Sequence, residues 1–115
     1  MSTRSFICMA IDEGYQGVYC HYDGYPDHVG RLLQAYHKDF AMAVDLVEGG
    51  AIRNFDNDGT AVLFGDGQHA EVYETIDRAL DAGFDYAYEF DGEQWKCYAK
   101  DYAPYKHVIE VEIPV

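Results

Sequence analysis

Residues Val18–Gly30 read Val-Tyr-Cys-His-Tyr-Asp-Gly-Tyr-Pro-Asp-His-Val-Gly. Alternating side chains at the start of this stretch predict a strand. Asp23-Gly24 then predicts a sharp turn, and Pro26 is typical of the first turn of a helix, where its missing N–H costs nothing. The stretch therefore predicts a strand, a turn and a helix start in succession. It also concentrates side chains that can ligate, titrate or hydrogen-bond: Cys20, His21, Asp23, Asp27 and His28.

A second strand is predicted just before this stretch. Phe6–Ile11 is a continuous apolar run of strand length, typical of a central strand covered on both faces, and residues 12–17 have turn chemistry. A hairpin turn centred near Gly14-Tyr15 would place Ser5 opposite Gly24. We therefore expect the N-terminus to meet the Asp-Gly-Tyr-Pro turn. The residues of this meeting, here called the turn corner, are the first candidate site: Arg4, Ser5, His21, Asp23, Tyr25, Asp27 and His28.

The middle of the chain predicts helices and short strands. Apolar residues recur with a helical period over residues 29–47, and Asp39 is a possible cap that would divide this segment into two helices. Residues 51–59 read as turn and Thr60–Phe64 as a short strand. A further helix is predicted over residues 69–82, with Val72, Ile76 and Ala79 on its buried side.

The last third predicts an aromatic hairpin and a final strand. Aromatic residues alternate with polar ones over residues 84–91, and a second alternating run begins at Trp95. An Asp91-Gly92 turn would pair Tyr88 with Trp95, whereas a turn one residue later shifts the register by two and keeps the same face. Residues 108–113 read as an edge strand that ends at Pro114.

These elements predict one domain over residues 1–115, of the α+β class, in the order β-β-α(α)-β-α-β-β-β. We expect a mostly antiparallel sheet with two or three helices packed on one face. No apolar run approaches the ~20 residues of a membrane span, and the start lacks the pattern of a secretory signal. A cytoplasmic protein without a membrane partner is therefore expected.

The charge is strongly acidic, with 21 acidic against 8 basic residues and a net charge of −13. Residues 56–93 hold eleven of the acids and one base, Arg78. Direct binding to nucleic acid is disfavoured, because that affinity comes from Lys and Arg. The acids could simply keep the chain soluble, or they could imitate nucleic acid and attract a basic host protein. The candidate partner surface comprises Asp66, Glu71, Glu74, Asp77, Asp81, Asp85 and Glu89.

The turn corner has two interpretations. As a functional site, Arg4 and a helix N-terminus would hold an anion while His21 or His28 acts with Asp23 in acid–base chemistry. As a structural feature, Arg4 would pair with Asp23 and tie the N-terminus to the turn.

No catalytic residue, cofactor or metal is predicted. Neither Ser5 nor Cys20 has the sequence context of a nucleophile. Cys8, Cys20 and Cys97 lie in strand patterns and read as buried, reduced thiols. Cys20 and its neighbouring histidines are possible zinc ligands by type, but they lack the paired spacing of a structural zinc site.

The N-terminal residues and the stretch around the turn resemble small proteins of bacteriophages, prophages and mobile elements. Those proteins begin Met-Gly-Thr-Arg-Ser and carry Tyr-Cys-His-Trp-Asp-Gly-Tyr-Pro before a helix. Ser2 and Tyr22 depart from this pattern, which weakens any stacking role at position 22. The matching residues are Thr3, Arg4, Ser5, Tyr19, Cys20, His21, Asp23, Gly24, Tyr25, Pro26, Gly30 and Trp95.

The resemblance implies a setting rather than an activity, because small acidic accessory proteins of phages often act on host machinery. We therefore expect a protein that binds and inhibits a host protein through its acidic surface. The host protein would be a nucleic-acid-handling defence complex such as a CRISPR effector. The alternative is a small-molecule protein that binds or hydrolyses a nucleotide signal at the Asp-Gly-Tyr-Pro turn. A virion or regulatory protein without an inhibitory role is a third possibility.

Overall fold

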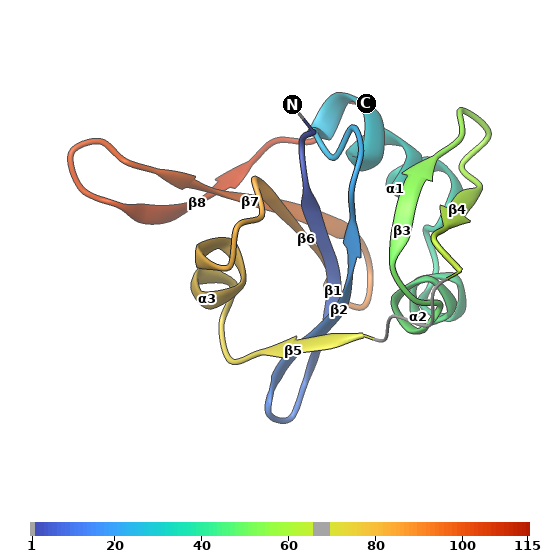
Figure 1. The fold of residues 1–115 in the computed structure, drawn as a ribbon, viewed down its shortest axis with the longest axis horizontal. Helices are drawn as coiled ribbons and strands as arrows, with labels where there is room; N and C mark the ends of the chain where they lie inside the picture. The colour runs from blue at the N-terminus through green and yellow to red at the C-terminus, as the bar shows by residue number, and fades with distance from the viewer. Residues whose placement is uncertain (1, 66–69) are drawn as a thin grey trace.

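The fold is built on a mixed sheet, seen in the computed structural model, which describes residues 2–65 and 70–115 (Figure 1). Its strands are β1 (Ser5–Ile11), β2 (Gly14–Cys20), β3 (Ile52–Phe55), β4 (Ala61–Leu63), β5 (Glu71–Tyr73), β6 (Tyr86–Phe90), β7 (Trp95–Asp101) and β8 (His107–Val111). They lie in the order β4-β3-β2-β1-β6-β7-β8, and β5 pairs with β2. The helical segments are η1 (Pro26–Gly30, π-helical), α1 (Arg31–Tyr36), α2 (Phe40–Glu48) and α3 (Ile76–Asp81).

The α+β prediction is confirmed, and most neighbouring strands are antiparallel. Parallel pairing occurs between β1 and β6 and between β2 and β3. Among the described residues no helix is long and apolar enough to cross a membrane. β8 lies at an edge of the sheet, as expected for the final strand.

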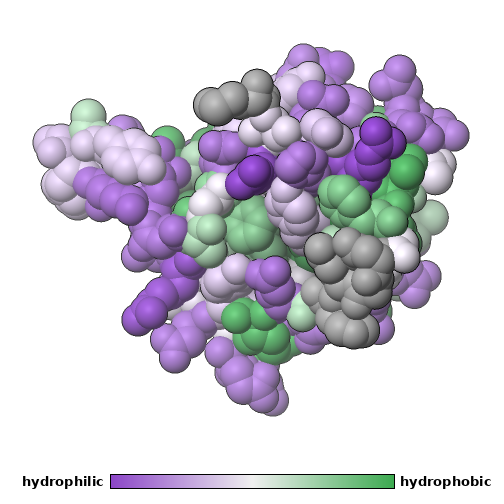
Figure 2. All heavy atoms as spheres, in the orientation of Figure 1, coloured by the Kyte–Doolittle hydropathy of each residue, from purple (hydrophilic) through white to green (hydrophobic). Residues whose placement is uncertain are grey.

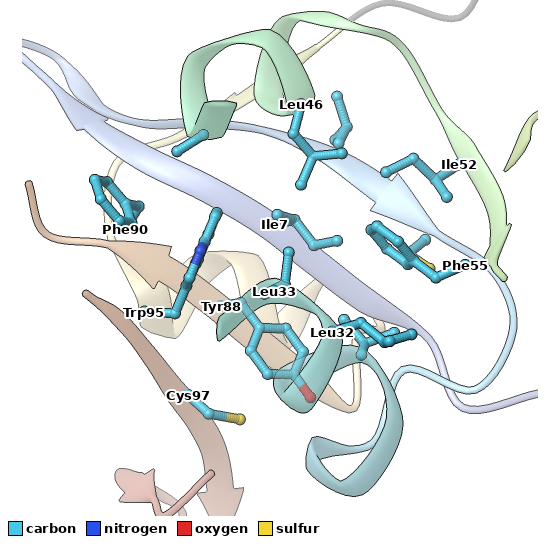
Figure 3. Close-up of a cluster of buried hydrophobic side chains, with 14 of the residues drawn as sticks. Ile7, Leu32, Leu33, Leu46, Ile52, Phe55, Tyr88, Phe90, Trp95 and Cys97 are labelled. Carbon is cyan, nitrogen blue, oxygen red and sulfur yellow. The ribbon is translucent and has the colours of Figure 1, made fainter. Parts of the chain in front are cut away.

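The helices cover both faces of the sheet, so the expectation that they share one face is wrong for α3. Ile7 packs with Leu33 and Tyr88 in the larger core, beneath α1 and α2 (Figure 3). Phe6 and Cys8, the alternate residues of β1, instead pack with residues of α3. The continuous apolar run of β1 explains this arrangement, because a strand that is apolar on both faces needs cover on both.

The first hairpin turns earlier than predicted. Ile11 pairs with Gly14 and Ser5 pairs with Cys20, so the turn is at Asp12-Glu13 and Ser5 does not lie opposite Gly24. Gly14 has φ +144° and lies against the backbone of Tyr73 in β5, where a side chain would not fit. This close approach favours glycine inside the strand rather than in the turn.

Two further segments differ from their predicted structure. Residues 52–55 form β3 rather than a turn. The helix predicted over residues 69–82 is shortened to α3, because residues 71–73 pair with β2 as β5 and the Thr75 side chain caps α3 by accepting from Arg78 N (3.0 Å). Val72 is consequently 54% exposed rather than buried. Position 69 lies outside the described residues.

The aromatic hairpin adopts the second of its two predicted registers. Phe90 pairs with Trp95 and Tyr88 pairs with Cys97. All four side chains are buried in the larger core. The register shift therefore leaves the aromatic face unchanged.

The predicted cap at Asp39 is confirmed, and its removal should weaken α2. The Asp39 carboxylate accepts a hydrogen bond from Met42 N at 2.9 Å. Asp39→Ala should lower the free energy of unfolding by about 1 kcal/mol, measured by urea denaturation. Asp39→Asn keeps an acceptor oxygen and should lose much less. Equal stability of Asp39→Ala and the wild type would show that the cap contributes nothing.

Candidate functional site

The N-terminus meets the Asp-Gly-Tyr-Pro turn, although the hairpin register differs from the predicted one. Gly24 N donates to Thr3 O at 2.9 Å, and the Tyr88 hydroxyl donates to Gly24 O at 2.7 Å. Ser5 is fully buried beneath the turn, and a Cβ on Gly24 would lie 2.8 Å from its Oγ. The turn is thus held against β1 and β6 by contacts on its buried side.

Asp23 and Arg4 have structural roles that differ from the predicted ion pair. Asp23 adopts a left-handed conformation (φ +56°), which its short polar side chain tolerates and which produces the turn. Arg4 joins the start of β6 through its backbone, since Arg4 N donates to Asp85 Oδ2 and Asp85 N donates to Arg4 O, both at 2.9 Å. No hydrogen bond or ion pair of the described residues links Asp23 to Arg4.

The two histidines of the corner have separate partners. His21 Nδ1 contacts the Tyr19 hydroxyl, and its Nε2 lies 3.4 Å from Ser2 Oγ. His28 Nε2 instead lies 3.1 Å from Phe55 O, beside η1. Within residues 2–65 and 70–115, no hydrogen bond links either ring to Asp23. The predicted acid–base constellation is therefore not assembled in this structure.

Asp27 and Tyr25 complete the corner and have different surroundings. Asp27 Oδ1 forms an exposed ion pair with Arg31 Nε at 3.0 Å, one helical turn away. Tyr25 is exposed and lines a cleft of about 370 Å³. The lining residues of this cleft, here called the tyrosine cleft, are Thr3, Tyr25, Phe84, Asp85, Tyr86, Ala99, Lys100 and Tyr102.

Sequence reasoning missed the tyrosine cleft because its walls come from distant strands. Thr3 precedes β1, Tyr86 begins β6 and Ala99 lies in β7. Only the parallel pairing of β1 with β6 brings the first two together, and no local pattern predicts that pairing.

The predicted acidic surface is divided by ion pairs. Asp77 and Asp81 on α3 both pair with Lys100, at 3.5 Å for Asp81, and Asp81 also pairs with Lys106 at 2.6 Å. The β7–β8 hairpin thereby neutralises α3. The carboxylate of Asp85 accepts the hydrogen bond from Arg4 N. Asp66 lies outside the described residues.

Glu71 and Glu74 join two acids that were not predicted as part of a surface. Glu71 pairs with Gly17 in the sheet, and the backbone of Glu74 lies against Gly14 at the end of the first hairpin. The turn residues Asp12 and Glu13 precede Gly14 directly and therefore lie near Glu74, just past the end of β5. No ion pair among the described residues involves any of the four. We call this group the β5 acidic patch: Asp12, Glu13, Glu71 and Glu74.

Glu89 is half-buried on the α3 face of the sheet, and its environment opposes ionisation. Burial, followed by the nearby Asp91 carboxylate, raises the pKa of Glu89. Lys96 acts in the opposite direction. Glu89 is thus a cost to the folded state at neutral pH rather than part of an open acidic surface.

Glu89→Gln should therefore raise the melting temperature at neutral pH. A carboxyl group whose pKa is raised by folding stabilises the protein below its unfolded pKa and loses that contribution as pH rises through the folded value. The gain in melting temperature should be present at about pH 7 and vanish below about pH 4, where the wild-type glutamic acid is neutral like the glutamine of the variant. Thermal unfolding across this range measures it, with the exposed Glu93→Gln as the control. A gain that persists at the acidic end would contradict this explanation.

The three cysteines are buried within the sheet. Burial raises the pKa of Cys20 and of Cys97 to about 12, and that of Cys8 well above its ordinary value. Thiolates are the reactive form, so these thiols lack the character of a nucleophile. No three His, Cys, Asp or Glu side chains within the described ranges are arranged to hold a metal ion.

The native thiols should resist modification. At about pH 8 we expect negligible reaction of the folded protein with a disulfide reagent such as DTNB, followed by reaction of all three thiols after denaturation. Absorbance of the released thiolate measures both states. Rapid modification of any thiol in the folded protein would show that its strand opens readily.

Comparison of this chain with protein-family models, curated proteins and solved structures finds no match.

Proposed function

We propose that this chain is a phage or mobile-element accessory protein that binds and inhibits a basic, nucleic-acid-handling host protein. The observation that carries this proposal is the β5 acidic patch, whose carboxylates take part in none of the described ion pairs, on a chain of net charge −13. Carboxylates without a cationic partner attract and orient a basic surface. Inhibition follows if the covered surface is the one that holds nucleic acid.

The ion pairs favour β5 over α3 as the contact. Lys100 and Lys106 neutralise the two aspartates of α3, which weakens their attraction for a further cation. Glu71 and Glu74 are exposed and have no such partner in the described chain. The same negative charge disfavours direct binding to nucleic acid.

Charge reversal of the patch tests the proposal. The tagged protein is incubated with nuclease-treated lysate of the bacterial host, and the retained proteins are identified by mass spectrometry. The wild type should reproducibly retain basic nucleic-acid-binding proteins, and retention should fall with rising salt. The double variant Glu71→Lys/Glu74→Lys should lose it.

The control is Glu93→Lys/Glu112→Lys, which changes the net charge equally at exposed positions outside the patch. It should retain the same proteins as the wild type. No reproducible retention, or equal loss in both double variants, would overturn the proposal that this patch is the contact.

The tyrosine cleft favours a second candidate, the binding or hydrolysis of a small molecule such as a nucleotide signal. Its volume of about 370 Å³ falls within the range of roughly 300–1,000 Å³ typical of ligand pockets. Aromatic rings that can stack on a base line the cleft together with Lys100. Thermal shift against a panel of nucleotides and metal ions tests this candidate.

Two variants distinguish a ligand bound in the tyrosine cleft from one bound at His21. A ligand of the cleft should raise the melting temperature of the wild type and of His21→Ala, which lies outside the lining, but not that of Tyr25→Ala. If no compound of the panel raises the melting temperature, the second candidate fails.

A further inference from the structure

Helix α2 is apolar on nearly all sides. It reads Phe-Ala-Met-Ala-Val-Asp-Leu-Val-Glu, and its inner residues Ala43, Leu46 and Val47 are buried. Phe40 and Met42 are nevertheless 60% and 46% exposed. A helix that is apolar all round is normally buried. Met42 and Phe40 line two different clefts, so two separate sides of α2 lack the cover that its sequence suggests.

A groove of about 350 Å³ runs between α2 and β4 on the side of the helix that carries Met42. Tyr36 and Leu63 in its lining are 47% and 46% exposed. Near β3 and β4 the separate face seen in Figure 2 also carries hydrophobic surface, although that face is otherwise largely hydrophilic. Contiguous exposed apolar surface of this kind marks interaction sites. The groove is lined by Tyr36, His37, Met42, Asp45, Leu46, Gly49, Ala61 and Leu63.

The end of this groove near the α1–α2 junction is held by hydrogen bonds. Trp95 Nε1 donates to His37 O at 2.7 Å, and His37 Nε2 lies 2.8 Å from Gly59 O. The Tyr36 ring packs directly on Gly59, where an added Cβ would clash with it. A preformed groove loses little conformational entropy on binding.

Asp45 lies in the lining of the groove, and the segment from which the whole lining comes is acidic. Residues 36–63 contain five acids and two bases, Lys38 and Arg53, and Arg53 lies over the Tyr22 ring at 5.8 Å. No ion pair of the described residues involves any of the five carboxylates. An occupant must therefore combine apolar side chains for the groove with positive charge for its rim. The acids are Asp39, Asp45, Glu48, Asp56 and Asp58.

We propose that the groove between α2 and β4 binds a basic amphipathic helix of a partner protein. Its apolar residues would recur every three or four positions and enter the groove, and its Lys or Arg residues would face the acidic rim. Met42 suits this role, because methionine adapts to varied apolar surfaces. A second copy of this chain fits poorly, since two chains of charge −13 repel each other. The inference rests on the proposed basic partner but uses a different surface from the β5 acidic patch.

A designed peptide tests the inference without knowledge of the partner. The probe has about 18 residues, or five helical turns, with Leu at helical spacing and Lys elsewhere. Its control has the same composition in an order that places Leu on all sides of the helix. Fluorescence anisotropy of the labelled peptides should show the wild-type chain binding the amphipathic probe about tenfold or more tightly than the control.

Groove variants locate the binding. Met42→Gln and Leu63→Ser should each weaken the probe about tenfold, as expected for central contacts of an interface. Val72→Ser, at an exposed apolar position on β5 outside the groove, should change it by about twofold or less. Melting temperatures establish that each variant is folded. The inference is overturned if both peptides bind equally, if neither groove variant weakens the probe, or if sedimentation shows a dimer that Leu63→Ser dissociates.

The proposals for the β5 acidic patch and for the groove can be tested independently of each other. Glu71→Lys/Glu74→Lys should abolish retention of lysate proteins while leaving probe affinity within about twofold, because neither glutamate lines the groove and exposed charges are screened at physiological salt. Loss of probe binding in the groove variants with unchanged lysate retention would place the main contact on β5 alone. If the groove variants lose lysate retention and Glu71→Lys/Glu74→Lys keeps it, the groove is the contact and the β5 acidic patch is removed from the proposed function.

Discussion

Tyr88→Phe is expected to lower the free energy of unfolding by about 1–3 kcal/mol, although it removes a single oxygen atom. Tyr88 is fully buried, and its hydroxyl donates to Gly24 O at 2.7 Å. The phenylalanine would leave that buried carbonyl without its donor in a region that water does not reach. Urea denaturation monitored by tryptophan fluorescence measures the loss, with the m-value as a check that the transition stays two-state.

The controls for this prediction lie on the same strand and in the same corner. Tyr86 is only half-buried, and its hydroxyl has no hydrogen bond among the described residues, so Tyr86→Phe should change stability by about 0.5 kcal/mol or less. His21→Ala removes only part-buried side-chain contacts, with Tyr19 and Ser2, and should cost about 1 kcal/mol or less. Wild-type stability of Tyr88→Phe would show that the turn does not depend on this bond.

This outcome bears on whether the turn corner is structural or functional. The left-handed Asp23 produces the turn, Gly24 allows close approach to Ser5, and Tyr88 holds the turn from below. These contacts explain the Asp-Gly pair without a ligand. Tyr25 is the corner residue that faces a cleft, and it is the one whose replacement separates the small-molecule candidate from the structural explanation.

Elements set by local chemistry were predictable from the sequence. Asp39 was identified as a cap because capping depends on residues three positions apart, and the aromatic hairpin was identified because alternation is local. β5 was missed because Val72 has the helical spacing of Ile76 and Ala79. Its strand conformation depends on pairing with β2, more than fifty residues earlier, which local periodicity does not encode.

The candidate surfaces were likewise predictable only where they depend on local sequence. A count of acids predicted Asp77 and Asp81 as part of a partner surface, but their charge is neutralised by lysines of a distant hairpin. Asp12 and Glu13 were passed over as turn residues, although the packing of the adjacent Gly14 against Glu74 brings their turn near the end of β5. Ion pairing and patch formation are tertiary properties, so net charge was predictable and its exposed arrangement was not.

Gly17→Ala is expected to cost about 3 kcal/mol of unfolding free energy, at the upper end of the usual range for overpacking. Gly17 is buried in β2 and is paired with Cys8 of β1 on one side and Glu71 of β5 on the other. An added Cβ would lie 2.6 Å from Cys8 Cβ, 2.8 Å from the Phe6 ring and closer still to Ile7 O. Backbone and Cβ atoms cannot rotate away, so the strands must separate. Urea denaturation measures the loss.

Gly49→Ala is the matched control, because Gly49 follows α2 with φ −78°, which alanine adopts readily, and its nearest contact would be 3.1 Å. This change should lie within about 1 kcal/mol of the wild type, since it also restricts the unfolded chain. Hydrogen exchange adds a spatial readout, because separation of β2 from its neighbours should speed exchange in β5 before it affects β7 and β8. The β5 acidic patch depends on that pairing, so Gly17→Ala should also reduce lysate retention. A Gly17→Ala protein as stable as Gly49→Ala, with wild-type exchange in β5, would contradict the close packing of β1, β2 and β5 on which the patch depends.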